Sequence, residues 1–133
     1  MTRAQCGCGQ LSAEINGDPD AVVMCHCLDC QRRSGSPFGV GAYYSESAVT
    51  LTGVSTRYTR AAGSGNDFTA GFCPICGSSV WWTTNYKPGV IGIAVGAIAD
   101  PDFAMPQRSV WEQSRHRWVD VSFTDVHFPR GRS

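Results

Sequence analysis

Hydrophobic and polar residues alternate in short runs along most of the chain, and this period predicts strands. The clearest run lies near the start, where Leu11, Ala13 and Ile15 alternate with polar residues as in a strand with one buried face. The same reasoning predicts further strands, bounded by turns rich in Gly, Pro, Asn and Asp, over 21–24, 38–44, 48–52, 56–59, 68–72, 79–83 and 108–113. One helical turn is expected in the segment that begins at residue 31, and Gly35 and Pro37 would end it. The pattern indicates a mainly β fold of short antiparallel strands.

The most apolar segment spans residues 89–99, and its length distinguishes a transmembrane helix from a buried strand. It is about half as long as a transmembrane helix, so a buried strand is expected, with residues 90–95 as the central strand of a sheet. Residues 63–66 have the composition of a flexible loop. Residues 114–133 form a polar tail, whose expected anchors are Trp118, Val119 and Val121.

Length and composition agree with one globular unit. A chain of 133 residues with 42% hydrophobic residues is expected to form a single domain, 1–133. The first five residues lead into Cys6 without an apolar signal segment, so the expected location is the cytoplasm, with no membrane partner.

The charge balance argues against nucleic acid as a partner. Eleven basic residues equal eleven acidic ones, so the sequence lacks the basic excess that binding to a phosphate backbone needs. Thiolates bound to a metal would make the protein more acidic still. Only Lys87 among the basic residues is lysine, and arginine is the better residue for fixed contacts to carboxylates or phosphates.

Seven cysteines are the strongest chemical signal. An odd number in a protein expected in the cytoplasm fits a disulfide framework poorly, so metal binding is favoured. Cys25, Cys27 and Cys30 have the spacing C-x-C-x-x-C, which lets one tight loop turn three sulfurs toward a common centre. Zinc prefers four ligands in a tetrahedron, so three cysteines would leave one position open for chemistry or ligand capture.

The other four cysteines form two pairs that lie far apart in the sequence. Cys6 and Cys8 are two residues apart, and in extended backbone both side chains would point to one side. Cys73 and Cys76 lie in C-P-x-C-G between two predicted strands, as in a zinc knuckle, where Gly77 permits a turn that faces backbone N–H groups toward sulfur. The two pairs together would make a closed structural site. A partition that joins the triple loop to either pair leaves three scattered ligands and is less economical.

The motifs C-x-C, then C-H-C-x-x-C-Q-R-x-S-G-S-P-F-G, then C-P-x-C-G-S resemble the family of glutathione-dependent formaldehyde-activating enzymes and centromere protein V. The resemblance covers about residues 6–120 and places all seven cysteines at the family's ligand positions. It implies a β-tent fold organised around zinc-binding cysteine loops. It also implies the condensation of glutathione with formaldehyde to S-(hydroxymethyl)glutathione, a carbon–sulfur lyase activity. Two zinc ions are implied, a structural one on Cys6, Cys8, Cys73 and Cys76, and a catalytic one on Cys25, Cys27 and Cys30.

The catalytic zinc would favour thiol chemistry. A three-thiolate zinc accepts a soft fourth ligand, so a small thiol such as glutathione suits it, and the bound thiolate could attack an aldehyde. With three protein ligands, this ion would be the easier one to lose. Candidate substrate-binding residues follow the loop, namely Arg32 and Arg33 for carboxylates, and Ser34 and Gly35 beside the open position. The alternatives are surface ion pairs for the arginines and helix termination for Ser34 and Gly35.

Other conspicuous residues are expected to be structural. His26 would point away from the metal and pack or form a hydrogen bond, and Phe38 would pack under the cysteine loop. His116 and His127 would face solvent. The tryptophans expected in the core are Trp81, Trp82 and Trp111.

Two other functions compete with this enzyme. A redox dithiol at either C-x-x-C needs a strand-to-helix βαβ setting, which the predicted strand pattern does not provide. A non-catalytic binding module, in which zinc only shapes a scaffold for a protein or chromatin partner, is the alternative that the centromere relative suggests.

Overall fold

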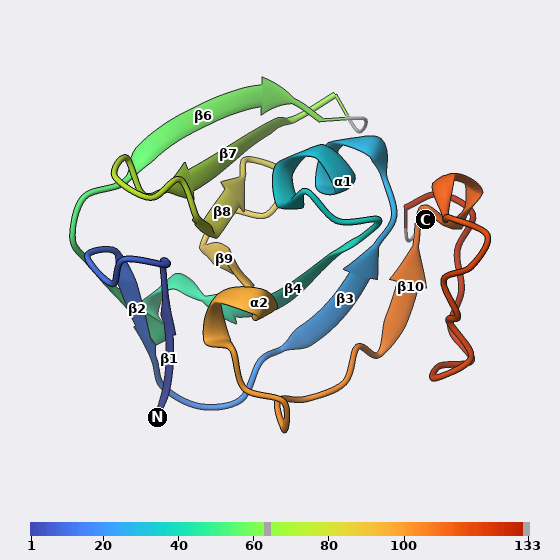
Figure 1. Ribbon diagram of the computed structural model, residues 1–133, viewed down its shortest axis with the longest axis horizontal. Coiled ribbons are helices and arrows are strands. Elements are labelled where there is room, and N and C mark those ends of the chain that lie inside the picture. The colour runs from blue at the N-terminus through green and yellow to red at the C-terminus, as the bar shows by residue number, and fades with distance from the viewer. Residues whose placement is uncertain (63–64, 132–133) are drawn as a thin grey trace. The chain divides into compact units, whose positions relative to one another are not determined.

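Figure 1 shows the computed structural model, which describes residues 1–62 and 65–131. The chain divides into two compact units. The first unit comprises Met1–Asp20 and Ala42–Phe103, and the second comprises Ala21–Gly41 and Ala104–Ser133. Each unit is therefore built from two segments that are separated in the sequence. The loop predicted over 63–66 lies partly outside the described residues.

A three-stranded antiparallel sheet belongs to the first unit. It contains β1 (Thr2–Gln5), β2 (Ser12–Ile15) and β5 (Val49–Thr52), with β2 in the middle. The 3-10 helix η1 (Glu46–Ala48) leads into β5. Leu11, Ala13 and Ile15 are fully buried, as their alternation predicted.

Four further strands of the first unit run antiparallel in the order β9-β8-β7-β6. They are β6 (Thr56–Ala61), β7 (Asp67–Phe72), β8 (Ser79–Thr84) and β9 (Val90–Ala94). Trp81 and Trp82 in β8 are only 3% and 4% exposed, so both belong to the core as expected. The neighbouring strands make room for them with glycine, because a Cβ on Gly71 would overlap the Trp81 indole and one on Gly92 would overlap Trp82.

The second unit is organised around β3 (Ala21–Cys25) and the helix α1 (Leu28–Ser34). Strand β10 (Arg108–Val110) pairs with β3, and the 3-10 helix η2 (Glu112–Ser114) follows it. Figure 1 shows β3 and β10 side by side. The chain then returns along β10, where Ser109 N–H donates to Val126 O at 3.0 Å and Phe128 N–H donates to Ser109 O at 3.0 Å. The C-terminal segment therefore covers the outer edge of β10.

The mainly β prediction is confirmed, but the prediction of antiparallel strands is wrong for β10. This strand runs parallel to β3, with Ser109 opposite Met24. It is also shorter than predicted, because Trp111 has a positive φ of 57° and turns the chain into η2. Trp111 itself is half-buried. Alternation predicts a strand but not the direction of its partner.

The prediction for residues 89–99 is correct only for its first half. After β9 the chain forms a short helix, α2 (Val95–Ile98), which lies against β1. Strand β4 (Gly39–Ser45), predicted over 38–44, begins in the second unit and ends in the first. None of the helices in the described residues has the length and hydropathy to cross a membrane.

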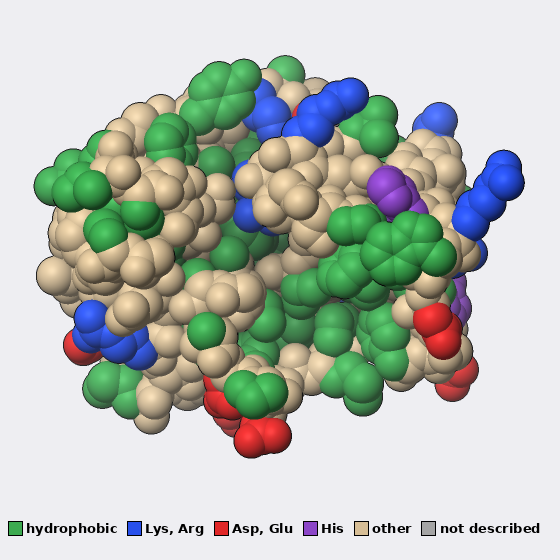
Figure 2. All heavy atoms as spheres, viewed as in Figure 1, with side chains coloured by type: hydrophobic (Ala, Val, Ile, Leu, Met, Phe, Trp, Pro, Cys, Tyr) green, Lys and Arg blue, Asp and Glu red, His purple; other side chains and the backbone are tan. Residues whose placement is uncertain are grey.

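Trp118 is not an anchor of the tail, because 73% of it is exposed. The reason is a tight turn, in which Arg115 Nη1 donates to Val119 O at 2.5 Å and Val119 N–H donates to His116 O at 3.0 Å. This turn buries Val119 and points Trp118 outward. Val119 is therefore the anchor that the tail provides, with Val121 half-buried beyond it. Figure 2 shows hydrophobic side chains gathered over β3 and β10.

Candidate metal centres

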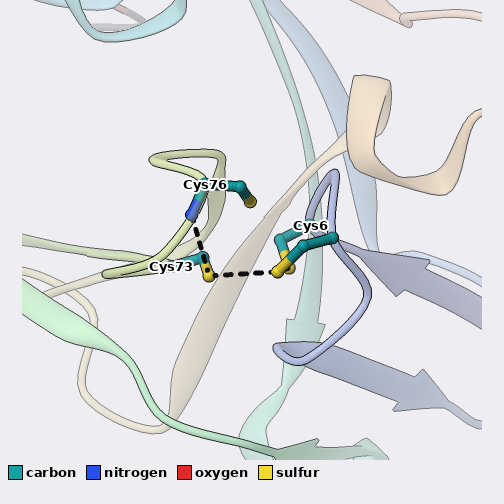
Figure 3. A group of neighbouring side chains, drawn as sticks. Cys6, Cys73 and Cys76 are labelled. Carbon is teal, nitrogen blue, oxygen red and sulfur yellow. Dashed lines mark hydrogen bonds between the residues drawn. The ribbon is translucent and has the colours of Figure 1, made fainter.

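The first cysteine cluster joins two loops of the first unit. Cys6 and Cys8 lie between β1 and β2, while Cys73 and Cys76 lie between β7 and β8. Their four sulfurs lie within 4.8 Å of one another. Figure 3 shows the side chains of Cys73 and Cys76 turned toward Cys6. The structure thus brings together the four residues that the sequence grouped.

The spacing of the sulfurs fits a tetrahedral zinc ion. Zn–S bonds of about 2.3 Å at tetrahedral angles place the sulfurs about 3.8 Å apart. The Sγ atoms of Cys6 and Cys8 are 3.7 Å apart, and those of Cys8 and Cys73 are also 3.7 Å apart. Four soft donors at this spacing suit zinc, and the cluster needs little rearrangement to hold it.

The first loop reaches this geometry by a turn and not by the extended backbone that was predicted. Gly9 N–H donates to Cys6 O at 3.1 Å, which closes a turn around Cys8. Leu11 N–H donates to Cys6 Sγ at 3.3 Å. Gly7 N–H donates to Ser78 Oγ at 3.0 Å and so ties the two loops together without a metal.

The second loop has the knuckle geometry that C-P-x-C-G predicted. Gly77 has a φ of 78°, a conformation that favours glycine, and its N–H donates to Cys73 O at 2.8 Å. The N–H groups of Ile75 and Cys76 both face Cys73 Sγ, at 3.4 and 3.5 Å. This part of the sequence interpretation is confirmed.

Hydrogen bonds lower the pKa of two of the four cysteines. The pKa of Cys8, despite a backbone hydrogen bond with Gln10, is raised to about 11 by burial and by hydrogen bonds with the other three cysteines. Hydrogen bonds from Ser78 lower the pKa of Cys76 to about 5. Burial raises the pKa of Cys73, but donors from the Cys76 backbone and the Gln10 side chain outweigh it, so that the pKa is lowered overall. Two of the four sulfurs are therefore disposed to be thiolates, the form in which cysteine binds metal.

The second cluster lies wholly within the second unit. Cys25 ends β3, Cys27 is the N-cap of α1, and Cys30 lies in the first turn of that helix. Their sulfurs lie within 4.8 Å of one another, and no fourth Cys, His, Asp or Glu of residues 1–62 and 65–131 joins the group. All three residues are half-buried.

The local structure of this cluster differs from the predicted loop. The helix begins at Leu28, inside the motif, and Cys30 N–H donates to Cys27 Sγ at 3.3 Å in the manner of an N-cap. Residues three apart share one side of a helix, so Cys27 and Cys30 face the same centre. The end of β3 then adds Cys25.

Without a cation, the protonated forms of Cys25 and Cys30 are favoured. Hydrogen bonds with Cys27 and Cys30, together with burial, raise the pKa of Cys25. The pKa of Cys30 is also raised, because the hydrogen bond and charge of Cys27 and burial outweigh the opposing bond with Cys25. Three thiolates this close repel one another, and a divalent cation is the simplest group to compensate them. The donor set therefore fits zinc.

His26 is packed and hydrogen-bonded, as predicted, and is not in the metal group. Its side chain is fully buried, and a 2.8 Å hydrogen bond joins its Nε2 to Ser109 Oγ. Burial lowers the pKa of His26, so the ring is neutral. The Phe38 ring packs edge-on against it, with centroids 6.1 Å apart. Ser109 was not identified from the sequence.

Gln31 is a second residue that sequence reasoning missed. Its Nε2 donates to His26 O at 2.8 Å and to Ser114 O at 3.1 Å, and its Oε1 lies 3.0 Å from His116 Nε2. The side chain thus links the cysteine loop to the segment after β10. His116 and His127 are exposed, as expected, but both form hydrogen bonds.

The four candidate substrate residues lie along or just beyond α1. Arg32 is exposed, whereas Arg33 is half-buried, with its guanidinium against Gly39. Gly35 has a φ of 67° and its N–H donates to Gln31 O, so it ends the helix. Ser34 Oγ donates to Cys30 O at 2.7 Å. The helix-termination alternative thus describes Gly35 and Ser34, and substrate binding stays a prediction.

Comparisons with known proteins identify a family and a similar fold. The family model described as glutathione-dependent formaldehyde-activating enzyme matches residues 1–114, a range that includes all seven cysteines. A Rhodobacter sphaeroides protein known from a crystal structure has a similar fold, with a TM-score of 0.58 and 17% sequence identity over 95% of this chain and 98% of that chain. A search of curated proteins gave no match. The β-tent arrangement itself stays a prediction. The extent of the family match shows that this chain belongs to the glutathione-dependent formaldehyde-activating enzyme family.

Proposed function

We propose that the chain is a zinc-dependent enzyme that joins a small thiol such as glutathione to formaldehyde or a related aldehyde. The observation that carries the proposal is the second cluster, where three sulfurs converge and no fourth described ligand completes the shell. The family description names the same two reactants. The reaction forms a carbon–sulfur bond, and its reverse is that of a carbon–sulfur lyase.

A zinc ion held by Cys25, Cys27 and Cys30 would accept the substrate thiol as its fourth ligand and lower that thiol's pKa. The chain's own contribution is to hold the three sulfurs at one centre. The N-cap contact fixes Cys27 against Cys30, and the buried His26–Ser109 contact holds the loop between Cys25 and Cys27. In the reaction the thiol sulfur bonds to the aldehyde carbon, and the thiol proton ends on the aldehyde oxygen.

The first cluster is proposed to hold a structural zinc ion. It links two loops that are 65 residues apart, as the Cys8–Cys73 contact shows, and its four ligands leave no open position. Two zinc ions per chain are therefore expected. The ion on three cysteines is expected to be the weaker one.

Metal content and turnover together test the proposal. The parent should bind two zinc ions per chain and form S-(hydroxymethyl)glutathione from glutathione and formaldehyde faster than the uncatalysed reaction. Cys27→Ser should keep the circular dichroism spectrum, lose one zinc ion and fall to the uncatalysed rate. A parent with two zinc ions and no activity toward any thiol and aldehyde pair would refute the enzyme.

Arg32 gives a separate test of substrate binding. Its exposed guanidinium follows Cys30 by two residues on α1, and its proposed partner is a carboxylate of the bound thiol. Arg32→Ala should raise KM for glutathione by several-fold and leave kcat nearly unchanged, since an exposed ion pair is worth at most about 1 kcal/mol. An unchanged KM would remove Arg32 from the site.

A binding module is the second candidate, and exposed apolar side chains in the second unit favour it. Trp118 is 73% exposed, and Leu28, inside the cysteine motif, is 53% exposed. Such residues are common where proteins meet. If Trp118→Ala abolished capture of a partner while the parent showed no turnover, the module would replace the enzyme.

A further inference from the structure

The side chain of Gln10 connects the first cysteine cluster to a third loop. Gln10 is half-buried and lies two residues after Cys8. Its Nε2 donates to Cys73 Sγ at 3.0 Å and to Val54 O at 2.7 Å, while Val54 N–H donates to its Oε1 at 2.9 Å. Val54 lies between β5 and β6, and its own side chain is 64% exposed. Two backbone hydrogen bonds to Gln10 therefore hold this loop.

These three contacts fix which end of the amide faces the sulfur. The oxygen meets a backbone N–H, and the nitrogen meets a backbone carbonyl, so the amide has one satisfied orientation. The flipped amide would place two donors together at Val54 N and two acceptors together at Val54 O. The second N–H of Nε2 therefore points at Cys73 Sγ as a donor.

The loop that binds Gln10 is shaped for this contact. Gly53 has a φ of 97°, and a Cβ at this position would overlap the backbone carbonyl of Gln10. Glycine lets the loop backbone come close enough for Val54 to pair with the amide. The contact thus depends on glutamine at position 10 and on glycine at position 53.

Cys73 is one of the two buried cysteines of this cluster. It is fully buried, and its backbone donors from Ile75 and Cys76 are longer, at 3.4 and 3.5 Å. A donor at 3.0 Å disperses the negative charge of a buried thiolate and weakens the repulsion among four thiolates around one cation. We infer that Gln10 is a positioning residue of the four-cysteine centre, which strengthens metal binding by donating to Cys73 Sγ and couples the 53–55 loop to the metal.

The inference rests on the proposed metal in the first cluster, and cobalt tests it apart from enzyme activity. In a Cys27→Ser background, Co²⁺ reports on the four-cysteine centre through its sulfur-to-cobalt charge-transfer band. Gln10→Glu keeps the shape of the side chain and replaces the donor by an acceptor. It should weaken Co²⁺ binding about 10- to 100-fold in chelator competition and shift the band to lower energy.

Gln113→Glu makes the same change at an exposed residue of the second unit, so it should match the parent in both readouts. If Gln10→Glu does not fold, Gln10→Met removes the donor without adding charge and is assessed in the same way. An unchanged affinity in the Gln10 variant, or a weaker affinity with an unshifted band, would overturn the donor role. Failure of the Cys27→Ser protein itself to bind Co²⁺ would instead refute the proposed metal site.

Discussion

The hydrogen bond between His26 and Ser109 joins two buried side chains, so the loss of one partner should measurably lower the free energy of unfolding. Both side chains are fully buried, and the bond of 2.8 Å joins residues 83 positions apart. Ser109→Ala leaves the His26 Nε2 without its partner, so the unfolding free energy should fall by about 1–3 kcal/mol. Denaturant unfolding of the zinc-loaded protein measures this change. Ser122→Ala, at an exposed serine, should change it by less than about 0.5 kcal/mol, and an equal effect of both variants would contradict the argument.

A pH-dependent contact involves His127 and Glu112, whose Nδ1 and Oε2 atoms are 2.7 Å apart. The hydrogen bond to Glu112 raises the pKa of His127 above its ordinary 6.5, so its stabilisation is complete below 6.5 and lost as pH rises through the raised pKa. Burial opposes ionisation of Glu112, but its bonds with His127 and Ser109 hold its pKa below the ordinary 4.5. That stabilisation is present above 4.5 and lost as pH falls through the lowered pKa.

The two contributions overlap between pH 4.5 and 6.5. His127→Asn should therefore lower Tm most within this window, measured at about pH 5.5, and the difference from the parent should shrink as pH rises above 6.5. Thermal scans of both proteins in matched buffers provide the measurement. A difference that stays constant from pH 5.5 to 9 would show that the charge of His127 is not involved.

The members of the two cysteine clusters could be predicted one by one, whereas the residues that support them could not. Cysteine spacing limits which sulfurs can meet, so the division into four and three followed from the sequence and is what the structure shows. Gln10, Gln31 and Ser109 have no comparable signal. A lone serine or glutamine in a sequence is usually at the surface, and the partners of these three lie on segments that only the fold brings near.

At the scale of elements, the packing of β8 depends on glycine in the strands beside it. An added Cβ on Gly71 would overlap the Trp81 indole, which is held in place by burial and by its 3.0 Å bond to Ser55 Oγ. Gly71→Ala should therefore destabilise the protein by about 1–3 kcal/mol, the range of an overpacked core.

Gly96→Ala is the matched control for this substitution. Gly96 lies in α2 with open space around its Cβ position, and its φ is not positive. Alanine there should be neutral or stabilise the helix by up to about 1 kcal/mol. Urea unfolding of both variants gives the comparison. Equal destabilisation by the two substitutions would contradict the proposed steric cause.

Strands were predictable as elements because burial on one face imposes alternation, as in β2. The pairing of the strands was harder to predict from the sequence. The parallel pairing of β10 with β3 depends on segments more than 80 residues apart, and nothing in three residues specifies it. The start of α1 was missed because cysteine is not among the usual N-cap residues, although Cys27 fills that role here.

At the scale of the whole molecule, each cysteine cluster belongs to a different unit. The first unit contains the four-cysteine cluster, and the second contains the three-cysteine cluster. The sequence predicted both clusters, and it also predicted a single domain. The single-domain organisation stays a prediction. The hydrophobic content of a chain limits the size of its core. It does not show which segments of the chain come together in each compact unit.

The separate placement of the clusters leads to opposite expectations for two cysteine variants. Binding of structural zinc contributes about 10–16 kcal/mol in small zinc domains, which equals or exceeds the total stability of a typical domain. Cys73 is fully buried, receives three hydrogen bonds at sulfur and lies in the cluster that joins two loops of the first unit. Cys73→Ser should therefore be unfolded at 25 °C and show no cooperative thermal transition.

Cys27→Ser should stay folded and keep its cooperative thermal transition. Cys27 is half-buried, and its cluster forms within residues 25–30, whose backbone β3 and α1 already hold in place. Circular dichroism melts with zinc content measured on the same samples test both, and a folded Cys73→Ser protein with its zinc retained would show that the four-cysteine centre is not structural.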